Sequence, residues 1–248
     1  EIKEEKVAVI GAGPVGTSCA YHLLQRGYPV DIFEAKENAG GMIRYGIPIY
    51  RLPKDTLQAE NNIVSQMGGK FIFNQKLGRD FDINDLFGKG YKAIFIACGA
   101  PLGSYLGMKD EDTSLAGYMN GIDFLENVYN GVEAGHPPVL DGDVVVVGGG
   151  NVAMDCCRAA CRVATGKTHL IYRRTEADAP ADHEEIVAAK AEGVEFHFLC
   201  GQDSLVVENG KITGLRVMDM ERTGPDASGR RGVRPIEGSE HVIPCSFV

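Results

Sequence analysis

The sequence predicts an α/β protein made of two parallel-sheet units, and two stretches carry that prediction. VAVIGAGPVG at residues 7–16 and VVVVGGGNVA at residues 144–153 each combine an apolar strand, a glycine turn and the start of a helix. Each is followed by a second short apolar run, at 30–33 and 169–172, which suits the next parallel strand. A chain of 248 residues with 44% hydrophobic content is long enough for two domains, which we place at 1–105 and 106–248.

Composition excludes several classes of partner. The net charge of −9 and the lack of a basic run longer than two arginines argue against binding nucleic acid. No apolar stretch reaches the length of a membrane span, and the charged start EIKEEK is unlike a signal peptide, so we expect a cytoplasmic protein with no membrane partner. Seven cysteines without a C-x-x-C pair, and six histidines without ligand spacing, predict reduced, mostly buried thiols and no metal site.

The first glycine turn has the spacing of a dinucleotide-binding site. Gly11 suits a tight turn, Gly13 lets a pyrophosphate approach the backbone, and Gly16 allows close packing of helix on strand. Pro14 suits the first helical turn, where its missing N–H is not needed. Glu34 ends the second strand, where its carboxylate can accept hydrogen bonds from the hydroxyls of an adenosine ribose. The first unit therefore suits FAD or NAD.

The second unit differs where its second strand ends. Gly148 and Gly150 begin the G-x-G-x-x-A variant of the motif, with Asn151 as the expected helix cap. In place of an acid, the strand at 169–172 is followed by Arg173 and Arg174. Two guanidinium groups can pair with a ribose 2′-phosphate, so this unit is predicted to bind NADPH. One chain would then hold a hydride donor and a flavin.

Three further stretches carry a family resemblance. GGMIRYGIPIYRLPKD at 40–55, GGGNVAMD at 148–155 and IYRR at 171–174 resemble the small-chain family of NADPH-dependent glutamate synthase. That group includes the flavin–NADPH module of dihydropyrimidine dehydrogenase and the NADPH-side subunits of electron-bifurcating transhydrogenases. The resemblance covers nearly the whole chain. It implies two Rossmann-like domains arranged as in glutathione reductase, with FAD in the first and NADPH in the second.

The resemblance also implies an activity and a set of binding residues. Electrons would pass from NADPH through the flavin to the iron–sulfur clusters of a partner domain or chain, which allows a hetero-oligomer. No catalytic side chain is required, because hydride transfer is the chemistry of the cofactors. The residues implied for FAD are Gly11, Gly13, Pro14, Gly16, Glu34, Gly40, Gly41, Met42, Arg51 and Leu77, with Leu77 close to the adenosine half. Those implied for NADPH are Gly148, Gly150, Asn151, Val152, Arg173 and Arg174.

The chain departs from the family pattern in three places. The run DAPAD at 178–182 lacks the methionine that relatives commonly carry before the proline. Many relatives also have an N-terminal helical domain whose cysteines bind iron–sulfur clusters, and we expect this chain to lack it. The family's FAD domain is completed by a return segment after the NADPH domain, and the sequence ends before one, so we expect an FAD domain truncated at its C-terminus.

Three other functions compete with this one. A disulfide reductase would need a redox-active cysteine pair facing the flavin, and a flavin monooxygenase would need an F-x-G-x-x-x-H linker; neither motif occurs. The remaining alternative is a truncated nucleotide-binding fragment or assembly subunit without activity of its own. Among local features, we expect a hairpin near 205–222 that turns at Asn209-Gly210, and a buried Cys98.

Overall fold

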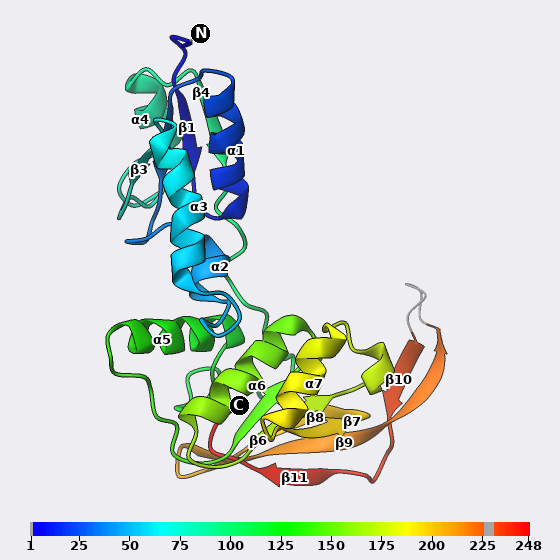
Figure 1. Ribbon diagram of the computed structural model, residues 1–248. Helices are drawn as coiled ribbons and strands as arrows, with labels where there is room; N and C mark the ends of the chain where they lie inside the picture. The colour runs from blue at the N-terminus through cyan, green and yellow to red at the C-terminus, as the bar shows by residue number, and fades with distance from the viewer. Residues whose placement is uncertain (1, 226–230) are drawn as a thin grey trace. The chain divides into compact units, whose positions relative to one another are not determined.

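The computed structural model describes residues 2–225 and 231–248 (Figure 1). Contacts between Cα atoms divide the chain into two compact units, Glu1–Leu102 and Gly103–Val248. None of the helices in the described residues has the length and apolar character needed to cross a membrane.

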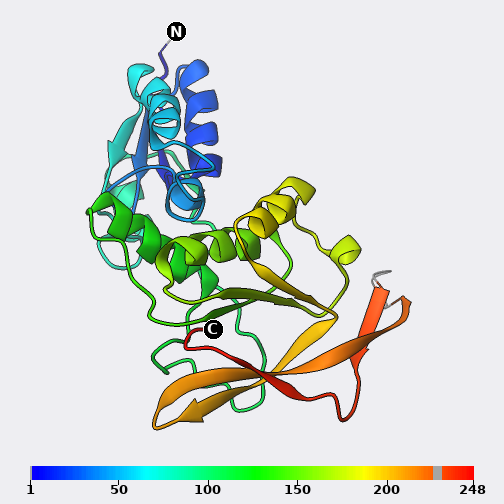
Figure 2. The same ribbon diagram turned by 60° about the horizontal axis from the view of Figure 1, so that its bottom comes forward.

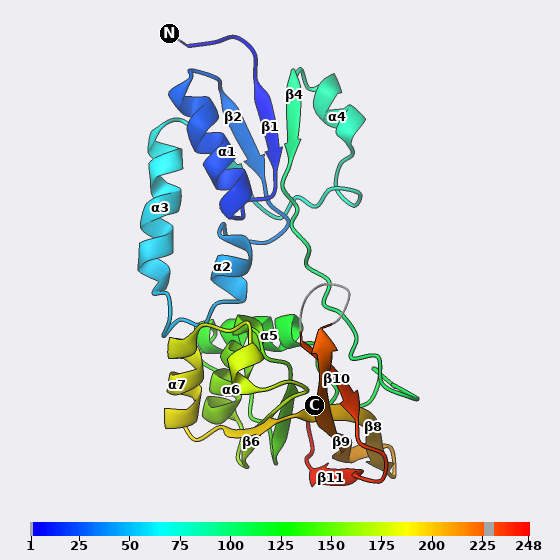
Figure 3. The ribbon, with the colours of Figure 1, turned by 90° about the vertical axis from the view of Figure 1, so that its right-hand side faces the viewer.

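The first unit is a four-stranded parallel sheet with helices on both faces. Its strands are β1 (Val7–Ile10), β2 (Val30–Phe33), β3 (Lys70–Ile72) and β4 (Ala93–Ile96), in the order β3-β2-β1-β4. Its helices are α1 (Pro14–Gln25), α2 (Gly41–Tyr45), α3 (Lys54–Gln66) and α4 (Ile83–Gly88). Figure 3 shows α1 and α3 on one side of the strands and α4 on the other.

Alternation along the strands explains this layering. Val9 and Ile32 pack in a cluster with residues of α1 and α3, whereas Ala8 and Ile10 pack against Leu86 of α4. Successive side chains of a strand point to opposite faces, so a continuous apolar run such as VAVI supplies both cores. β4 is an edge strand of this sheet. Its residue Phe95 is 38% exposed and its residue Ile96 is 54% exposed.

The second unit begins with a three-stranded parallel sheet. Its strands β5 (Val144–Val147), β6 (Thr168–Tyr172) and β7 (Glu195–Phe198) lie in the order β5-β6-β7. Its helices are α5 (Gly121–Glu133), α6 (Asn151–Val163) and α7 (His183–Ala191), with a short 3₁₀ turn, η1 (Glu176–Asp178). Leu170 of β6 packs against Met154 of α6 and Ile186 of α7, so these helices cover one face of the sheet.

An antiparallel sheet covers the opposite face. It consists of β8 (Cys200–Glu208), β9 (Lys211–Pro225), β10 (Arg231–Pro235) and β11 (His241–Pro244), and β9 pairs with each of the other three. Val145 and Ile171 of the parallel sheet share a core with Leu215 and Val217 of β9. Figure 2 shows these strands on the side of β5–β7 away from α6 and α7.

Most sequence-based boundaries are close to the observed ones. The apolar strands predicted to open the stretches 7–16 and 144–153 are β1 and β5, and the runs predicted as strands at 30–33 and 169–172 are β2 and β6. The predicted hairpin lies within β8 and β9, and its turn has positive φ at Asn209 (51°) and Gly210 (75°), as a tight hairpin turn requires. The short helix α2 was not predicted.

Candidate functional site

The three glycines of the first turn have different surroundings. Gly11 has a φ of +104°, and a Cβ there would lie 2.3 Å from the carbonyl oxygen of Ala97. A Cβ on Gly16 would lie 1.9 Å from the carbonyl oxygen of Gly11. Gly13 has a φ of −76°, and a Cβ there would meet its nearest atom only at 3.8 Å. The fold itself thus requires glycine at the first and third positions, while the middle one leaves open backbone for a ligand.

The helix after this turn begins without a side-chain cap. Gly13 is the N-cap of α1, Pro14 is its first residue, and no side chain accepts a hydrogen bond from the first turn. Val15 in that turn is 60% exposed. The N–H groups that open a helix have no intrahelical partner and favour anions, so the start of α1 suits a phosphate group.

Glu34 lies where β2 ends, beside the glycine turn. Its side chain is buried, with one carboxylate oxygen accepting from the N–H of Ala12 (2.8 Å) and the other from the N–H of Lys36 (2.9 Å). Each carboxylate oxygen can accept more than one hydrogen bond. The carboxylate is therefore held in place by the backbone and keeps acceptor capacity for the hydroxyls of a ribose.

A second glycine pair packs on the first turn. The N–H of Gly40 donates to the carbonyl of Ala12 (2.8 Å), and a Cβ on Gly41 would lie 2.8 Å from the Cα of Gly13. Gly40 and Gly41 have φ values of +130° and +52°, which favour glycine. Met42 follows in α2 with 37% of its side chain exposed. The predicted residues Gly11, Gly13, Gly16, Glu34, Gly40 and Gly41 therefore form one cradle.

Two further residues predicted for FAD, Leu77 and Arg51, lie outside this cradle. Leu77 packs with Phe81 and Phe33 in the core on the α4 side of the sheet. Two residues before it, the N–H of Gln75 donates to the carbonyl of Glu34, so the segment runs beside the end of β2. Arg51 is half-buried in the turn before α3, where its N–H donates to the carbonyl of Pro48.

The second glycine turn repeats the plan of the first. Gly148 has a φ of +143°, and a Cβ on Gly150, the N-cap of α6, would meet its nearest atom only at 3.9 Å. No side chain caps α6, and Val152 in its first turn is 51% exposed. The third position carries a natural methyl group, that of Ala153. The two turns share an open middle glycine and an uncapped helix start.

The prediction that Asn151 caps the helix is wrong. Gly150 occupies the cap, and Asn151 is the first residue of α6. Its side chain instead bonds to Asp182, donating through Nδ2 to the carboxylate (3.0 Å) and accepting from the backbone N–H (2.9 Å). Asn151 therefore ties the glycine turn to the start of α7, a contact between residues 31 positions apart that no local pattern reveals.

A cavity of about 430 Å³ lies beside the second turn. It is lined by β5, by Gly148, Gly150 and Val152 of the turn and by the start of α5 at Asn120 and Gly121. A Cβ on Gly121 would lie 3.0 Å from the Sγ of Cys156, so α5 approaches α6 closely at this point. The cavity is mostly apolar and adjoins two helix starts, which suits a ligand with a flat ring and a charged group.

Two arginines follow β6, and a third arginine, from β9, contacts the residues just after them. Arg173 is exposed and Arg174 is half-buried, as expected for the residues after a strand at the edge of a nucleotide site. Arg222 of β9 reaches the same region, donating to the hydroxyl of Thr175 (2.9 Å) and lying 3.9 Å from the carboxylate of Asp178. Sequence reasoning missed Arg222, because nothing local to β9 indicates which turn it approaches.

Two predictions about reactive side chains are wrong. Cys98, expected to be buried, is exposed just beyond β4, although four of the other cysteines are buried as expected.

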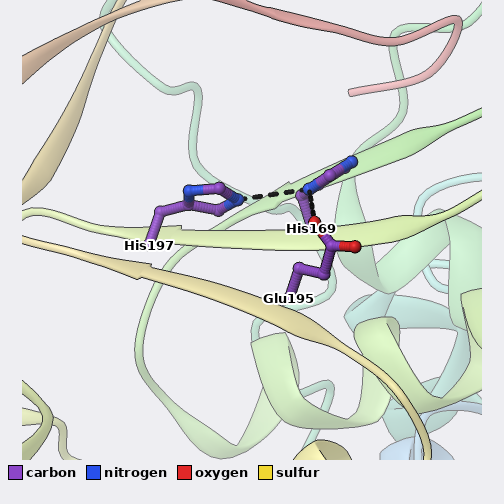
Figure 4. Close-up of side chains that lie close together, drawn as sticks. All are labelled: His169, Glu195 and His197. Atoms are coloured by element: carbon purple, nitrogen blue, oxygen red, sulfur yellow. Dashed lines mark hydrogen bonds and ion pairs between the residues drawn. The ribbon is translucent and has the colours of Figure 1, made fainter.

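The histidines are not all dispersed. His169 Nδ1 lies 3.2 Å from His197 Nε2 and 3.4 Å from a carboxylate oxygen of Glu195 (Figure 4). These residues come from neighbouring strands, β6 and β7, whose pairing cannot be derived from spacing along the chain.

Comparison with known proteins gives a consistent result. The family profile described as pyridine nucleotide-disulphide oxidoreductase matches residues 5–227. The beta subunit of the NADP(+)-dependent formate dehydrogenase of Moorella thermoacetica is 45% identical over 245 residues, which are 98% of this chain and 34% of that protein. The glutamate synthase (NADPH) small chain of Escherichia coli K12 is 34% identical over 252 residues, 98% of this chain and 53% of that one. The predicted resemblance is confirmed.

A solved structure supports the fold. FprA of Mycobacterium tuberculosis, determined in complex with NADPH, superposes with a TM-score of 0.81 at 18% identity, covering 99% of this chain and 70% of FprA. This similarity confirms the predicted pair of Rossmann-like α/β units. The chain spans between a third and about half of the length of the two curated relatives.

Proposed function

The chain belongs to the pyridine nucleotide-disulphide oxidoreductase family, and from that premise we propose that it is part of an NADPH-oxidising FAD oxidoreductase. In this proposal residues 1–105 bind FAD and residues 106–248 bind NADPH. The flavin, when bound, would accept a hydride from NADPH and release electrons to iron–sulfur clusters of a partner domain or chain.

The residues present fit both cofactors. In each unit the middle glycine, Gly13 or Gly150, leaves space that a Cβ would fill, and an uncapped helix start lies next to it. Those backbone N–H groups would bind the pyrophosphates. Glu34 would accept from the ribose of FAD, while Gly40, Gly41, Met42 and Arg51 would line the path toward its ring system. Leu77 would lie near the adenosine.

One observation carries the assignment of NADPH to the second unit. The two units share the same turn, yet β2 is followed by a buried carboxylate and β6 by two guanidinium groups. A carboxylate repels a 2′-phosphate, whereas Arg173 and Arg174 can form charge-assisted hydrogen bonds with it. The apolar cavity beside Val152 and Gly121 would accept the nicotinamide end of the nucleotide.

The names of the relatives support the proposal that this chain works with a partner chain. One is the beta subunit of a formate dehydrogenase and the other is the small chain of a glutamate synthase, so both relatives work beside another chain. We propose the same for this chain, with an iron–sulfur protein as the electron acceptor.

Nucleotide selectivity tests the proposal. Charge-assisted hydrogen bonds contribute about 1.5–3 kcal/mol each, so NADPH should bind at least about tenfold more tightly than NADH in isothermal titration calorimetry. The double variant Arg173→Ala/Arg174→Ala should lose most of this preference while its affinity for NADH stays within about twofold.

A matched control distinguishes the loss of the two arginines at the proposed site from a general loss of positive charge. Arg234 is an exposed arginine of the same unit, paired with Glu221 at 2.6 Å, and Arg234→Ala should keep the preference. Equal dissociation constants for NADPH and NADH in the unmodified protein would overturn the assignment of the second unit. So would an Arg173→Ala/Arg174→Ala variant that still prefers NADPH.

A further inference from the structure

Three potential metal ligands meet on the face of the parallel sheet opposite to α6 and α7. His169 of β6 is opposite Glu195 in the register of the two strands, and His197 lies two residues further along β7. Because side chains alternate along a strand, all three point to the same face, toward the antiparallel sheet. Among residues 2–225 and 231–248, this is the one group of three such side chains whose ligand atoms lie within 4.8 Å of one another.

We propose that His169, Glu195 and His197 form a binding site for a zinc-class divalent cation. In the proposal His169 contributes Nδ1, His197 contributes Nε2 and Glu195 contributes the carboxylate oxygen that faces His169. Two imidazoles and one carboxylate are a ligand set found in zinc sites that keep a further position for water.

The spacing of the ligand atoms supports zinc over a harder cation. Bond lengths of about 2.0–2.1 Å in a tetrahedron place neighbouring ligand atoms about 3.3–3.4 Å apart. The corresponding separation in an octahedron with similar bond lengths is about 2.9 Å. Nδ1 of His169 lies 3.2 Å from Nε2 of His197 and 3.4 Å from Oε2 of Glu195, so the two separations that include Nδ1 are close to the tetrahedral value. All three ligand atoms lie within 4.8 Å of one another. Figure 4 shows His169 between the other two side chains.

The second oxygen of Glu195 has a separate partner. Lys167 places its Nζ 2.7 Å from Oε1, while Oε2 faces His169. A lysine on one oxygen orients the carboxylate and leaves the other oxygen to bind one cation as a single ligand. Glu195 is also the accessible part of the cluster, with a side chain 44% exposed against 9% for His169, so a cation can enter from solvent beside it.

The site is distinct from the nucleotide site proposed above. His169 lies at the amino-terminal half of β6, whereas Arg173 follows its carboxyl end. Four residue steps along the strand, at about 3.3 Å each, place Arg173 about 13 Å from His169. A bound cation would link β6 to β7 at the end of the sheet away from the glycine turn, so zinc binding and NADPH binding should be independent.

Metal titration of the purified protein tests the proposal. After dialysis against a chelator, Zn²⁺ is titrated in the presence of a chromophoric competitor, and Co²⁺ is added in parallel as a spectroscopic probe. We expect one Zn²⁺ per chain with a dissociation constant of about 1 μM or tighter, and the visible absorption of tetrahedral Co²⁺. Glu195→Gln and His197→Gln should each weaken Zn²⁺ binding at least about tenfold.

Controls distinguish the cluster from adventitious histidine binding. His22→Gln removes an exposed histidine of the first unit, whose Nδ1 lies 3.3 Å from Oε1 of Gln25, and it should bind Zn²⁺ like the unmodified protein. NADPH titration reports that Glu195→Gln remains folded, since that variant changes an exposed side chain remote from the arginines. Absence of stoichiometric Zn²⁺ binding, or equal affinity in Glu195→Gln and the unmodified protein, would overturn the proposal.

Discussion

Single glycines divide into those that the fold needs and those that leave room for a ligand. A methyl group on Gly16 would lie 1.9 Å from the carbonyl oxygen of Gly11, and backbone cannot move away as a flexible side chain can. A methyl group on Gly150 would meet nothing closer than 3.9 Å. A third-position glycine and a middle-position glycine of these turns therefore differ in what a substitution should disturb.

We expect Gly16→Ala to lower the free energy of unfolding of the first unit by about 3 kcal/mol or more, because the overlap forces backbone to shift. Gly150→Ala should change stability by no more than about 1 kcal/mol, the size of an N-cap effect, but should weaken NADPH binding about tenfold or more by blocking approach to the backbone. Urea denaturation and calorimetric titration measure the two effects. A similar loss of stability in both variants would contradict this division.

At the scale of the elements, ion pairs connect helix α6 to helix α7 and to the residue that follows α7. Arg158 of α6 lies 2.6 Å from Glu185 of α7 and 2.8 Å from Glu192, which follows α7. Arg162 adds a second contact to Glu192 at 2.6 Å. The Arg158 side chain is only 12% exposed, so these ion pairs are shielded more than ordinary surface pairs.

Because of these ion pairs, the free energy of unfolding should depend on pH. Hydrogen bonds from Arg162 and then Arg158 lower the pKa of Glu192 to about 2, against about 4.3 in an unfolded chain. A carboxylate with a lowered folded pKa stabilises the protein above its unfolded pKa, and this contribution is lost as the pH falls toward the folded value.

We therefore expect Glu192→Gln to unfold about 1 kcal/mol more easily than the unmodified protein near neutral pH, after allowance for solvent screening. The difference should shrink as the pH falls from about 5 toward about 3. Urea denaturation at several pH values measures it, and Glu208→Gln, which changes an exposed carboxylate of the hairpin, is the control. A difference between Glu192→Gln and the unmodified protein that is constant with pH would show that the charge is not responsible.

The elements also show which features of the fold and site could be predicted from local sequence patterns. The strands and helices around the two glycine turns could be predicted to within a residue or two, because an apolar run, a G-x-G turn and a helical pattern are all local signals. The register of β6 on β7 is not local, so the meeting of His169 and His197 could not be predicted. The same holds for Arg222 beside Thr175 and for Asn151 on Asp182. Glu34 was predicted at its position, but its bonds to Ala12 and Lys36 were not.

At the scale of the whole molecule, the buried apolar clusters fall into two separate sets, one in each unit. The apolar clusters of Glu1–Leu102 and those of Gly103–Val248 share no residues, and each unit contains its own glycine turn. Multidomain chains of this kind commonly depart from a single two-state transition.

Scanning calorimetry should therefore resolve two unfolding transitions. NADPH at about 100 times its dissociation constant stabilises the state that binds it by about 2.7 kcal/mol, and we expect this shift in one transition only. The Arg173→Ala/Arg174→Ala variant, measured at the same NADPH concentration, should lose most of that shift. A single transition that moves as a whole with NADPH would show that Glu1–Leu102 and Gly103–Val248 unfold together.

The exposed Cys98 gives the molecule a natural attachment point. Burial raises the pKa of Cys156 to about 12 and that of Cys200 to about 11, so both remain protonated and inert toward alkylating reagents near neutral pH. Cys98 is the exposed thiol among residues 2–225 and 231–248, and its backbone N would lie 3.3 Å from a Cβ on Gly11. A fluorophore coupled there sits at the entrance to the first glycine turn, where its emission can report the arrival of a nucleotide without any engineered residue.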